Sequence, residues 1–248
     1  MMRNLLFNSS KSILLMITFF TRIPIKLQSE FDDNDYKLGI ILLPIIGIVI
    51  GIGLLILKIF TFISSTYVLG LILTLFYLWI SGGLHLDGLG DTLDGLFSGR
   101  DRESQLEIMK DSRLGTFGAL GLIFVIGAYI ILLGEGTLAT VFLMPIVGKS
   151  STMLSAYMSD YARDEEGLGF KFITLSDKTV RNSAFAFSFI IGIITNYMIL
   201  IPMVLTFIIA GITTKWIQKK IGGSTGDTLG FINEFSQVMF LLLTNVIL

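Results

Sequence analysis

Long apolar runs without charged residues dominate the pattern of this chain. Four of them contain no Asp, Glu, Lys or Arg: residues 38–57, 59–86, 114–134 and 182–214, with lengths of 20, 28, 21 and 33 residues. A helix needs about 20 apolar residues to cross the hydrocarbon core of a bilayer. Four runs of this length in one chain argue against buried helices of a soluble domain. The pattern predicts an all-α protein, a polytopic helical bundle integral to a membrane.

Two further stretches extend this prediction. Residues 138–158 and 228–248 are apolar apart from Lys149 and Glu234. The 33-residue run would be about 50 Å long as one helix, more than one crossing requires. We therefore expect two short helices that meet near Asn196, with a single long tilted helix as the alternative. The sequence predicts about six to seven transmembrane helices in a single domain over residues 1–248.

The N-terminus has a different pattern. Residues 13–20 are apolar, but eight residues are too few to span, and Arg3 and Lys11 precede them. A signal peptide would be followed by a cleavage site of small residues, which this segment lacks. We expect an interfacial helix within a cytoplasmic or interfacial N-terminal segment, residues 1–37.

The basic residues indicate an orientation. Of the 18 Lys and Arg residues, 16 fall in four segments: 1–37, 85–113, 159–181 and 215–227. Segments rich in Lys and Arg stay on the cytoplasmic side of a membrane. The four segments are therefore predicted to share the cytoplasmic face, an asymmetry that the net charge of −1 hides.

Composition limits the chemistry. The chain is 53% hydrophobic and 15% charged, with no cysteine and one histidine. Disulfide frameworks, iron–sulfur clusters and thiolate–zinc sites are excluded. A nucleic-acid partner is not expected, because there is no basic excess. The ligands present in number are oxygen atoms, so any bound metal should be a hard cation such as Mg²⁺, Mn²⁺ or Ca²⁺.

The densest polar cluster follows the second apolar run. Asp87, Asp91 and Asp94 are spaced four and three residues apart, which places them within about 60° on one face of a helix. Three carboxylates on one face repel each other, and a divalent cation that also binds substrate phosphate would remove the conflict. The alternative is a solvated acidic loop with helix-capping aspartates. We expect Mg²⁺ and phosphate binding here.

Residues close to this cluster add candidate roles. His85 precedes the acids, and an irregular turn at Gly88 and Gly90 is expected to bring it towards them as a base or an orienting group. Before the third run, Lys110 and Arg113 are candidate phosphate ligands and Asp111 a candidate metal ligand. The alternative for the two basic side chains is a positive-inside anchor.

Two further segments are candidate phosphate sites. Lys149 lies inside a predicted span, where a charge usually marks a site, although snorkelling to the interface is the alternative. The glycine-rich stretch 222–230 opens the last span, and we expect Gly223, Thr225 and Asp227 to bind substrate there. Amide groups at such a helix N-terminus bind phosphate, and the alternative is an ordinary loop with a helix cap at Thr225 or Asp227.

Four segments together resemble the cobalamin synthase family, the adenosylcobinamide-GDP ribazoletransferases. They are Phe-Thr-Arg-Ile-Pro at 20–24, His-Leu-Asp-Gly-Leu-Gly-Asp-Thr-Leu-Asp-Gly at 85–95, Met-Lys-Asp-Ser-Arg-Leu-Gly at 109–115 and Gly-Gly-Ser-Thr-Gly-Asp-Thr-Leu-Gly at 222–230. They occur in the family's order, and Glu234 matches the glutamate that follows the last of them. A second acid that could follow is replaced by Ser236 and Gln237.

The resemblance implies a Mg²⁺-dependent transferase in the cytoplasmic membrane of a bacterium or archaeon. A ribose hydroxyl of α-ribazole, or of its 5′-phosphate, attacks the corrinoid-side phosphorus of adenosylcobinamide-GDP. GMP leaves, and adenosylcobalamin or its 5′-phosphate forms. Asp87, Asp91, Asp94 and Asp111 would hold Mg²⁺, with Asp94 or His85 as base and Lys110, Arg113 or Lys149 neutralising phosphate charge. The lipid bilayer is the other partner, and the oligomeric state, a homo-oligomer included, is left open.

Other classes remain alternatives. A CDP-alcohol phosphotransferase would have an Ala-Arg pair after its first Asp-Gly and a spacing of four between its last two acids, whereas Asp91 and Asp94 are three apart. A membrane prenyltransferase would need a second acidic motif, for which Asp227 and Glu234 are a poor match. A transporter would place its charges near the bilayer midplane, whereas these acids are predicted at one face.

Overall fold

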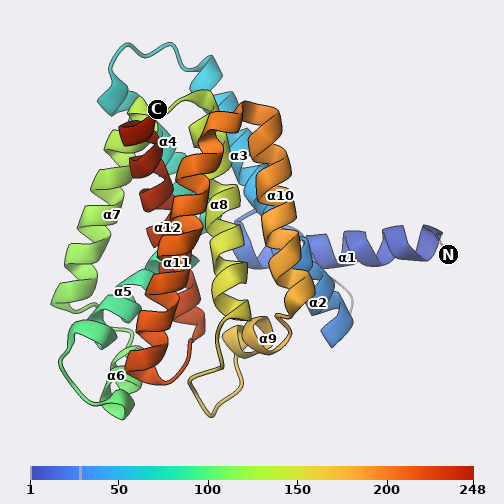
Figure 1. Ribbon diagram of the computed structural model, residues 1–248, viewed down its shortest axis with the longest axis vertical. Helices are drawn as coiled ribbons and strands as arrows, with labels where there is room; N and C mark the ends of the chain where they lie inside the picture. The colour runs from blue at the N-terminus through green and yellow to red at the C-terminus, as the bar shows by residue number, and fades with distance from the viewer. Residues whose placement is uncertain (1, 28–29) are drawn as a thin grey trace.

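The computed structural model describes residues 2–27 and 30–248, which fold almost entirely into helices. In chain order they are α1 (Met2–Phe20), α2 (Asp33–Ile41), α3 (Leu43–Phe60), α4 (Thr66–Ser81), α5 (Leu84–Phe97), α6 (Arg102–Ile108), α7 (Thr116–Glu135), α8 (Leu138–Tyr157), α9 (Leu168–Thr174), α10 (Lys178–Asn196), the 3₁₀ turn η1 (Tyr197–Ile199), α11 (Leu200–Ile221) and α12 (Gly226–Ile247). The long helices run roughly side by side as one bundle (Figure 1).

The prediction of a helical membrane bundle is confirmed. Within the described residues, five stretches are long and apolar enough to cross a membrane: α3, α7, α8, the α10–α11 stretch and α12. Large apolar side chains point outward from these helices, and Ile123, Phe124 and Ile194 are 70–77% exposed. A water-soluble monomer rarely exposes so much apolar surface, whereas lipid solvates it.

The long uncharged run at 182–214 forms a helical hairpin. Helix α10 ends at Asn196, whose side chain accepts a hydrogen bond from the Met198 amide and so caps the turn η1. The Phe207 ring then packs back against Phe185 and Phe189, at centroid distances of 5.5 and 6.3 Å. Two antiparallel helices that meet near Asn196 were the favoured prediction, and both the contacts and Figure 1 confirm it.

Helix α8 is the centre of the bundle, with α3, α10, α11 and α12 packed around it. Almost every side chain from Thr140 to Ala156 is buried. Helix α3 lies so close to α8 that a Cβ atom added at Gly47 would be only 2.6 Å from the Ile146 Cα. Lys149, the charge predicted inside a span, therefore lies in the protein interior rather than against lipid.

The connection from α4 to α5 is a sharp bend. Gly82 and Gly83 have φ angles of +71° and +78°, in the left-handed region that favours glycine. The helix axes on either side differ by 92°, so α5 leaves the direction of α4 and lies across the end of the bundle. The prediction of an irregular turn at Gly88 and Gly90 is wrong, because both residues lie inside the continuous helix α5. The glycines that form the turn are Gly82 and Gly83.

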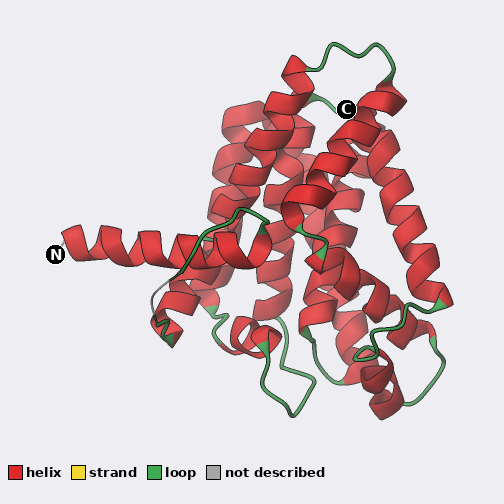
Figure 2. Cartoon of the chain, turned by 180° about the vertical axis from the view of Figure 1, so that it is seen from behind, coloured by secondary structure: helices red, strands yellow, loops and turns green. Residues whose placement is uncertain are grey.

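The N-terminal helix is longer than predicted and lies across the bundle, with its N-terminus pointing away from it (Figure 1). Its C-terminal part packs on the bundle: Leu15 and Met16 are buried, and the Lys11 ammonium pairs with Asp35 at 2.6 Å. Its end at Phe20 leads into a loop that runs back beside α1 (Figure 2).

A contact between α5 and α12 positions the polar end of the bundle. A Cβ atom at Gly88 would lie 2.8 Å from the Asp227 Cα, and one at Gly230 would lie 3.2 Å from the His85 Cα. The two backbones therefore touch. The loops that follow α5, α6 and α8, and the turn before α12, gather at this same end (Figures 1 and 2).

This contact leads to a prediction for Gly88→Ala. The added methyl group must push α5 away from the α12 backbone, and overpacking of this kind costs about 1–3 kcal/mol. We expect a lower unfolding temperature in detergent, measured by intrinsic fluorescence. The matched control is Gly127→Ala, also in a helix, where an added Cβ would meet nothing within 4 Å. Equal stability of the two variants would contradict the packing role.

Candidate active site

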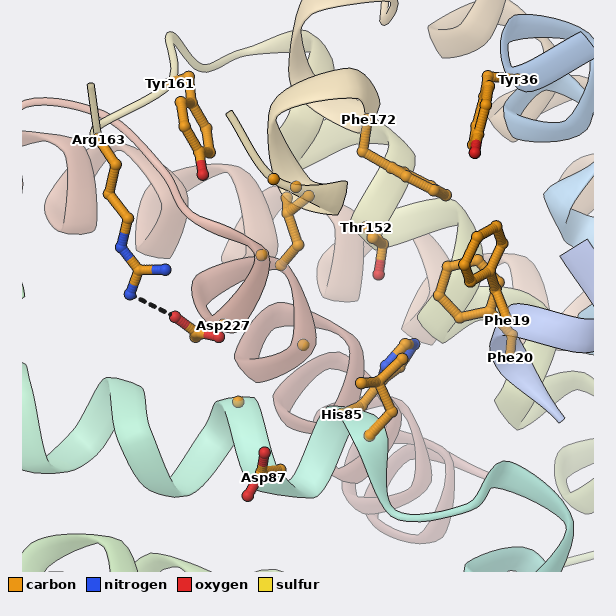
Figure 3. A pocket seen from close by; sticks show the side chains of 17 residues that line it. Phe19, Phe20, Tyr36, His85, Asp87, Thr152, Tyr161, Arg163, Phe172 and Asp227 are labelled. Atoms are coloured by element: carbon orange, nitrogen blue, oxygen red, sulfur yellow. Dashed lines mark hydrogen bonds and ion pairs between the residues drawn. The ribbon is translucent and has the colours of Figure 1, made fainter. Parts of the chain in front are cut away.

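A cavity of about 280 Å³ opens at the polar end of the bundle. It is lined by residues from α1, α2, α5, α8, α9, α12 and the loop before α9. Figure 3 shows a charged side of the cavity, with Asp87, Arg163 and Asp227, and an aromatic side, with Phe19, Phe20, Tyr36 and Phe172. Two of the predicted motifs, the aspartate helix and the glycine-rich loop, therefore meet at one pocket.

Two carboxylates from two helices, Asp87 and Asp227, line the charged side, and Asp91 lies next to them. Asp87 and Asp91 are one turn apart on α5, and Asp227 is in the first turn of α12. Burial raises the pKa of Asp91 to about 7, and the negative charges of Asp87, Asp227 and Asp94 add to this effect. Burial and the neighbouring negative charges both disfavour the ionised form of Asp91, and a bound cation would offset both effects.

The arrangement is not a closed metal cage. Among the described residues, no three His, Cys, Asp or Glu side chains lie close enough together to hold a metal ion unaided. The oxygen chemistry of Asp87, Asp91 and Asp227 nevertheless suits Mg²⁺, which is usually held by one or two carboxylates together with substrate phosphate oxygens. The residues present fit a metal that is completed by a phosphate substrate.

Arg163 is the cation of this pocket. Its guanidinium donates to Asp227 Oδ2 at 2.7 Å, and its Nε is buried without a hydrogen-bond partner. Arg102 holds the loop beneath it by donating to the backbone carbonyls of Ile221 and Ala162 at 2.8 and 2.9 Å. A half-satisfied guanidinium that faces a pocket is suited to a phosphate oxygen.

Asp94 is not free at this site. Its Oδ2 accepts the Gly115 amide at 2.7 Å, and its Oδ1 accepts the Gly118 amide at 2.9 Å. The carboxylate thus stabilises the N-terminus of α7, where backbone amides lack helical partners and the helix dipole favours a negative charge. Each oxygen keeps a further lone pair, so the roles of Asp94 as metal ligand and base stay predictions.

Three predicted site residues that precede α7 lie outside the cavity: Lys110, Asp111 and Arg113. Arg113 is fully solvated and pairs with Asp111 at 2.6 Å, and Lys110 pairs with the exposed Glu165 at 2.8 Å. Hydrogen bonds from Arg113 hold the pKa of Asp111 below its usual value. The structure does not bring Asp111, Lys110 or Arg113 to Asp87.

His85 lines the pocket and is backed by a buried lysine. Lys149 Nζ lies 2.7 Å from His85 Nε2 and 3.2 Å from Asn233 Oδ1, with its charge over the Phe20 ring. A lysine ammonium has no acceptor, so it donates to Nε2, and the imidazole is neutral with its proton on Nδ1. Lys149 lies behind His85 rather than on the pocket surface.

Glu234 belongs to a buried polar cluster further inside. Its carboxylate accepts hydrogen bonds from Tyr77, Tyr129 and the Asn233 amide at 2.7, 2.6 and 2.9 Å. Asn233 links this cluster to Lys149. The negative and positive charges are therefore paired through one amide, as charges in a membrane interior require.

The glycine-rich loop forms a helix cap. Thr225 is buried, and its hydroxyl and the Thr228 hydroxyl each accept the other residue's amide in a capping box. Gly223 packs on the 160–162 backbone, since a Cβ atom there would lie 2.5 Å from the Asp160 carbonyl oxygen. Of the three loop residues expected to bind substrate, only Asp227 lines the cavity.

Several pocket residues were not singled out in the sequence. Arg163 contributed only to the positive-inside count, and Tyr36, Thr152, Tyr161 and Phe172 carry no motif. Phe20 was indicated by the sequence, because it begins the segment 20–24 that resembles a family motif. Its ring packs edge-on against His85 at 5.3 Å, which explains why that distant segment belongs to the site.

The capping role of Asp94 is testable with Asp94→Ala, which removes both acceptors of the α7 N-terminus. We expect a loss of about 1–2 kcal/mol of stability, the usual cost of a helix cap, seen as a lower unfolding temperature. Asp87→Asn, on the same helix and in the cavity, should leave that temperature nearly unchanged. If Asp94→Ala unfolded at the wild-type temperature, its carboxylate would be available for chemistry.

Comparisons with known proteins agree over the whole chain. A family model described as cobalamin-5-phosphate synthase matches residues 12–245. The adenosylcobinamide-GDP ribazoletransferases of Alkaliphilus oremlandii and Clostridium acetobutylicum are 40% and 39% identical, covering 94% and 96% of this chain and 96% and 97% of their own. The Escherichia coli protein of the same name is 38% identical over 94% of this chain and 98% of its own. No solved structure matches. The chain belongs to the cobalamin-5-phosphate synthase family.

Proposed function

We propose that this protein transfers the corrinoid phosphate of adenosylcobinamide-GDP to a ribose hydroxyl of α-ribazole or its 5′-phosphate, forming adenosylcobalamin or its 5′-phosphate and releasing GMP. The observation that carries the proposal is the meeting of Asp87 with Asp227 and Arg163 at one cavity, with Asp91 one turn further along α5. Relatives of near-equal length share the name of this activity. The acids and the arginine supply what phosphoryl transfer needs most, which is positioning and charge neutralisation.

We assign Mg²⁺ to the oxygen atoms of Asp87, Asp91 and Asp227. When bound, the cation would neutralise the diphosphate and stabilise charge on the transferred phosphoryl group. Arg163 lines the same cavity and pairs with Asp227, and its guanidinium would bind an oxygen of the departing GMP. These four side chains come from three segments that the α5–α12 contact brings together.

His85 acts in this scheme as a hydrogen-bond donor. Because Lys149 occupies Nε2, the Nδ1 proton is the one that can be offered to a substrate oxygen. A neutral imidazole so arranged does not take the hydroxyl proton at Nδ1. Asp87, which lines the cavity beside it, is the better placed acceptor for that proton.

We place the site on the cytoplasmic face of the membrane. The segments that carry 16 of the 18 basic residues include all the loops at the pocket end of the bundle. Lys58, in contrast, caps the carbonyl groups of Leu133 and Gly134 near the opposite end. Both substrates are polar and water-soluble, so they would reach the site from the cytoplasm.

The activity is tested with purified protein in detergent, Mg²⁺, adenosylcobinamide-GDP and α-ribazole. We expect one GMP released for each completed cobamide, with both products quantified by chromatography. Asp87→Asn and Asp91→Asn should abolish turnover while the protein remains in the membrane. The matched control is Glu107→Gln, an exposed acid on α6. Release of CMP from a CDP-alcohol, without any cobamide, would overturn the proposal.

The role of Arg163 gives a second prediction. Arg163→Gln keeps hydrogen-bonding capacity but removes the charge, and we expect kcat/KM for adenosylcobinamide-GDP to fall at least about tenfold, as for loss of a charge-assisted phosphate contact. Arg100→Gln, an exposed arginine at the same end of the bundle, is the control. Equal kinetics for the two variants would remove Arg163 from the site.

A further inference from the structure

The aromatic side of the cavity has no role in the chemistry described so far. It is formed by the end of α1, by α2 and by α9, which contribute Phe19, Phe20, Tyr36 and Phe172 (Figure 3). The charged side lies across the cavity, on α5, α12 and the loop before α9. A ligand that fills this space must therefore have one apolar, aromatic part and one polar part.

The aromatic side is built as a rigid wall. The rings of Phe20 and Phe172 meet edge to face with centroids 5.4 Å apart, and both side chains are more than nine-tenths buried. Phe20 is also fixed by the His85 ring on its other side. Side chains held in this way present preformed surfaces for a flat ring, and such aromatic contacts add to the gain from apolar burial.

We propose that this aromatic side binds the benzimidazole base of α-ribazole, with the ribose directed towards Asp87 and Asp227. The inference rests on the proposed function and goes beyond it, since it assigns the acceptor nucleoside to a defined half of the pocket. A base seated against Phe172 would place the ribose hydroxyl groups in the middle of the cavity, beside His85. The acids and Arg163 would then meet the phosphoryl group from the other side.

The chemistry of the wall favours benzimidazole over guanine. The edge of guanine carries several donors and acceptors, and each one buried without a partner costs free energy. The aromatic side offers few polar groups: the Tyr36 hydroxyl, and the Thr152 hydroxyl that already donates to the Gly148 carbonyl oxygen at 3.1 Å. A dimethylbenzimidazole nucleoside has one free ring nitrogen, which a single hydroxyl donor satisfies.

Size excludes the corrinoid from this space. Pockets for drug-sized molecules begin at about 300 Å³, and a cavity of about 280 Å³ suits a nucleoside. A corrin ring with its amide side chains is several times larger. The corrinoid must therefore lie outside, with only its phosphate-bearing arm reaching the acidic side.

A cysteine introduced at Thr152 tests the assignment by direct occupancy. The natural chain has no cysteine, so Thr152→Cys gives one thiol at the centre of the cavity, which a small methanethiosulfonate reagent can modify. We expect α-ribazole to slow modification at least about tenfold and guanosine or GMP to leave the rate unchanged. Phe62→Cys, 95% exposed in the α3–α4 loop, is the control and should be unprotected by any ligand. Protection by GMP rather than α-ribazole would overturn the inference.

A kinetic test uses Phe172→Ala. Removing the ring should raise KM for α-ribazole about tenfold or more, a shift expected for loss of a buried aromatic contact, and leave KM for adenosylcobinamide-GDP within about twofold. Phe172→Leu should recover part of the loss, and Phe62→Ala should match wild type. A raised KM for adenosylcobinamide-GDP alone would reject the assignment even if cobamide is made.

If wild type makes no cobamide at all, the proposed function fails, whereas the thiol experiment still reports which nucleoside occupies the pocket.

Discussion

The backbone contact between α5 and α12 is the constraint on which the site depends. Gly88 and Gly230 have no side chains, so the helices touch where they cross. Only at this separation does Asp87 share a cavity with Asp227, which is about 140 residues away in the chain. The bend at Gly82 and Gly83 is the second requirement, because it turns α5 across the end of the bundle. The positions of the carboxylates therefore depend on these four glycines, which permit the helix contact and the bend.

Hydrogen-bonded polar groups inside the bundle stabilise the region around the α5–α12 contact. Unpaired charges in a membrane protein interior are costly, and here Glu234 is satisfied by Tyr77 and Tyr129 while Lys149 is satisfied by His85 and Asn233. The chain of contacts runs from the centre of the bundle to the pocket wall. With the Lys149 ammonium donating to Nε2, the proton of the neutral His85 ring is on Nδ1, so buried residues that touch no substrate still determine what the ring can donate.

The fold was largely predictable from the sequence, because apolar runs are a local property. The hairpin turn at Asn196 followed from length alone, since 33 residues exceed one crossing. The site was less predictable. Arg113 and Arg163 are equivalent in sequence, both being basic residues in polar loops, yet only Arg163 lines the cavity. Asp94 shares a helical face with Asp87, yet the α7 amides hold it. Such differences arise from tertiary contacts between distant segments, which spacing along one helix does not encode.

The division of the cavity also explains why the N-terminal helix belongs to the enzyme. Most of α1 extends away from the bundle, as an anchor would, but its last residues, Phe19 and Phe20, complete the aromatic wall. The Phe20 ring contacts His85, Phe172 and the Lys149 charge at once. One ring thus joins the apolar side of the pocket to the polar network behind it. The end of α1 would then hold the nucleoside, while the helices of the bundle hold the acids that act on the phosphate.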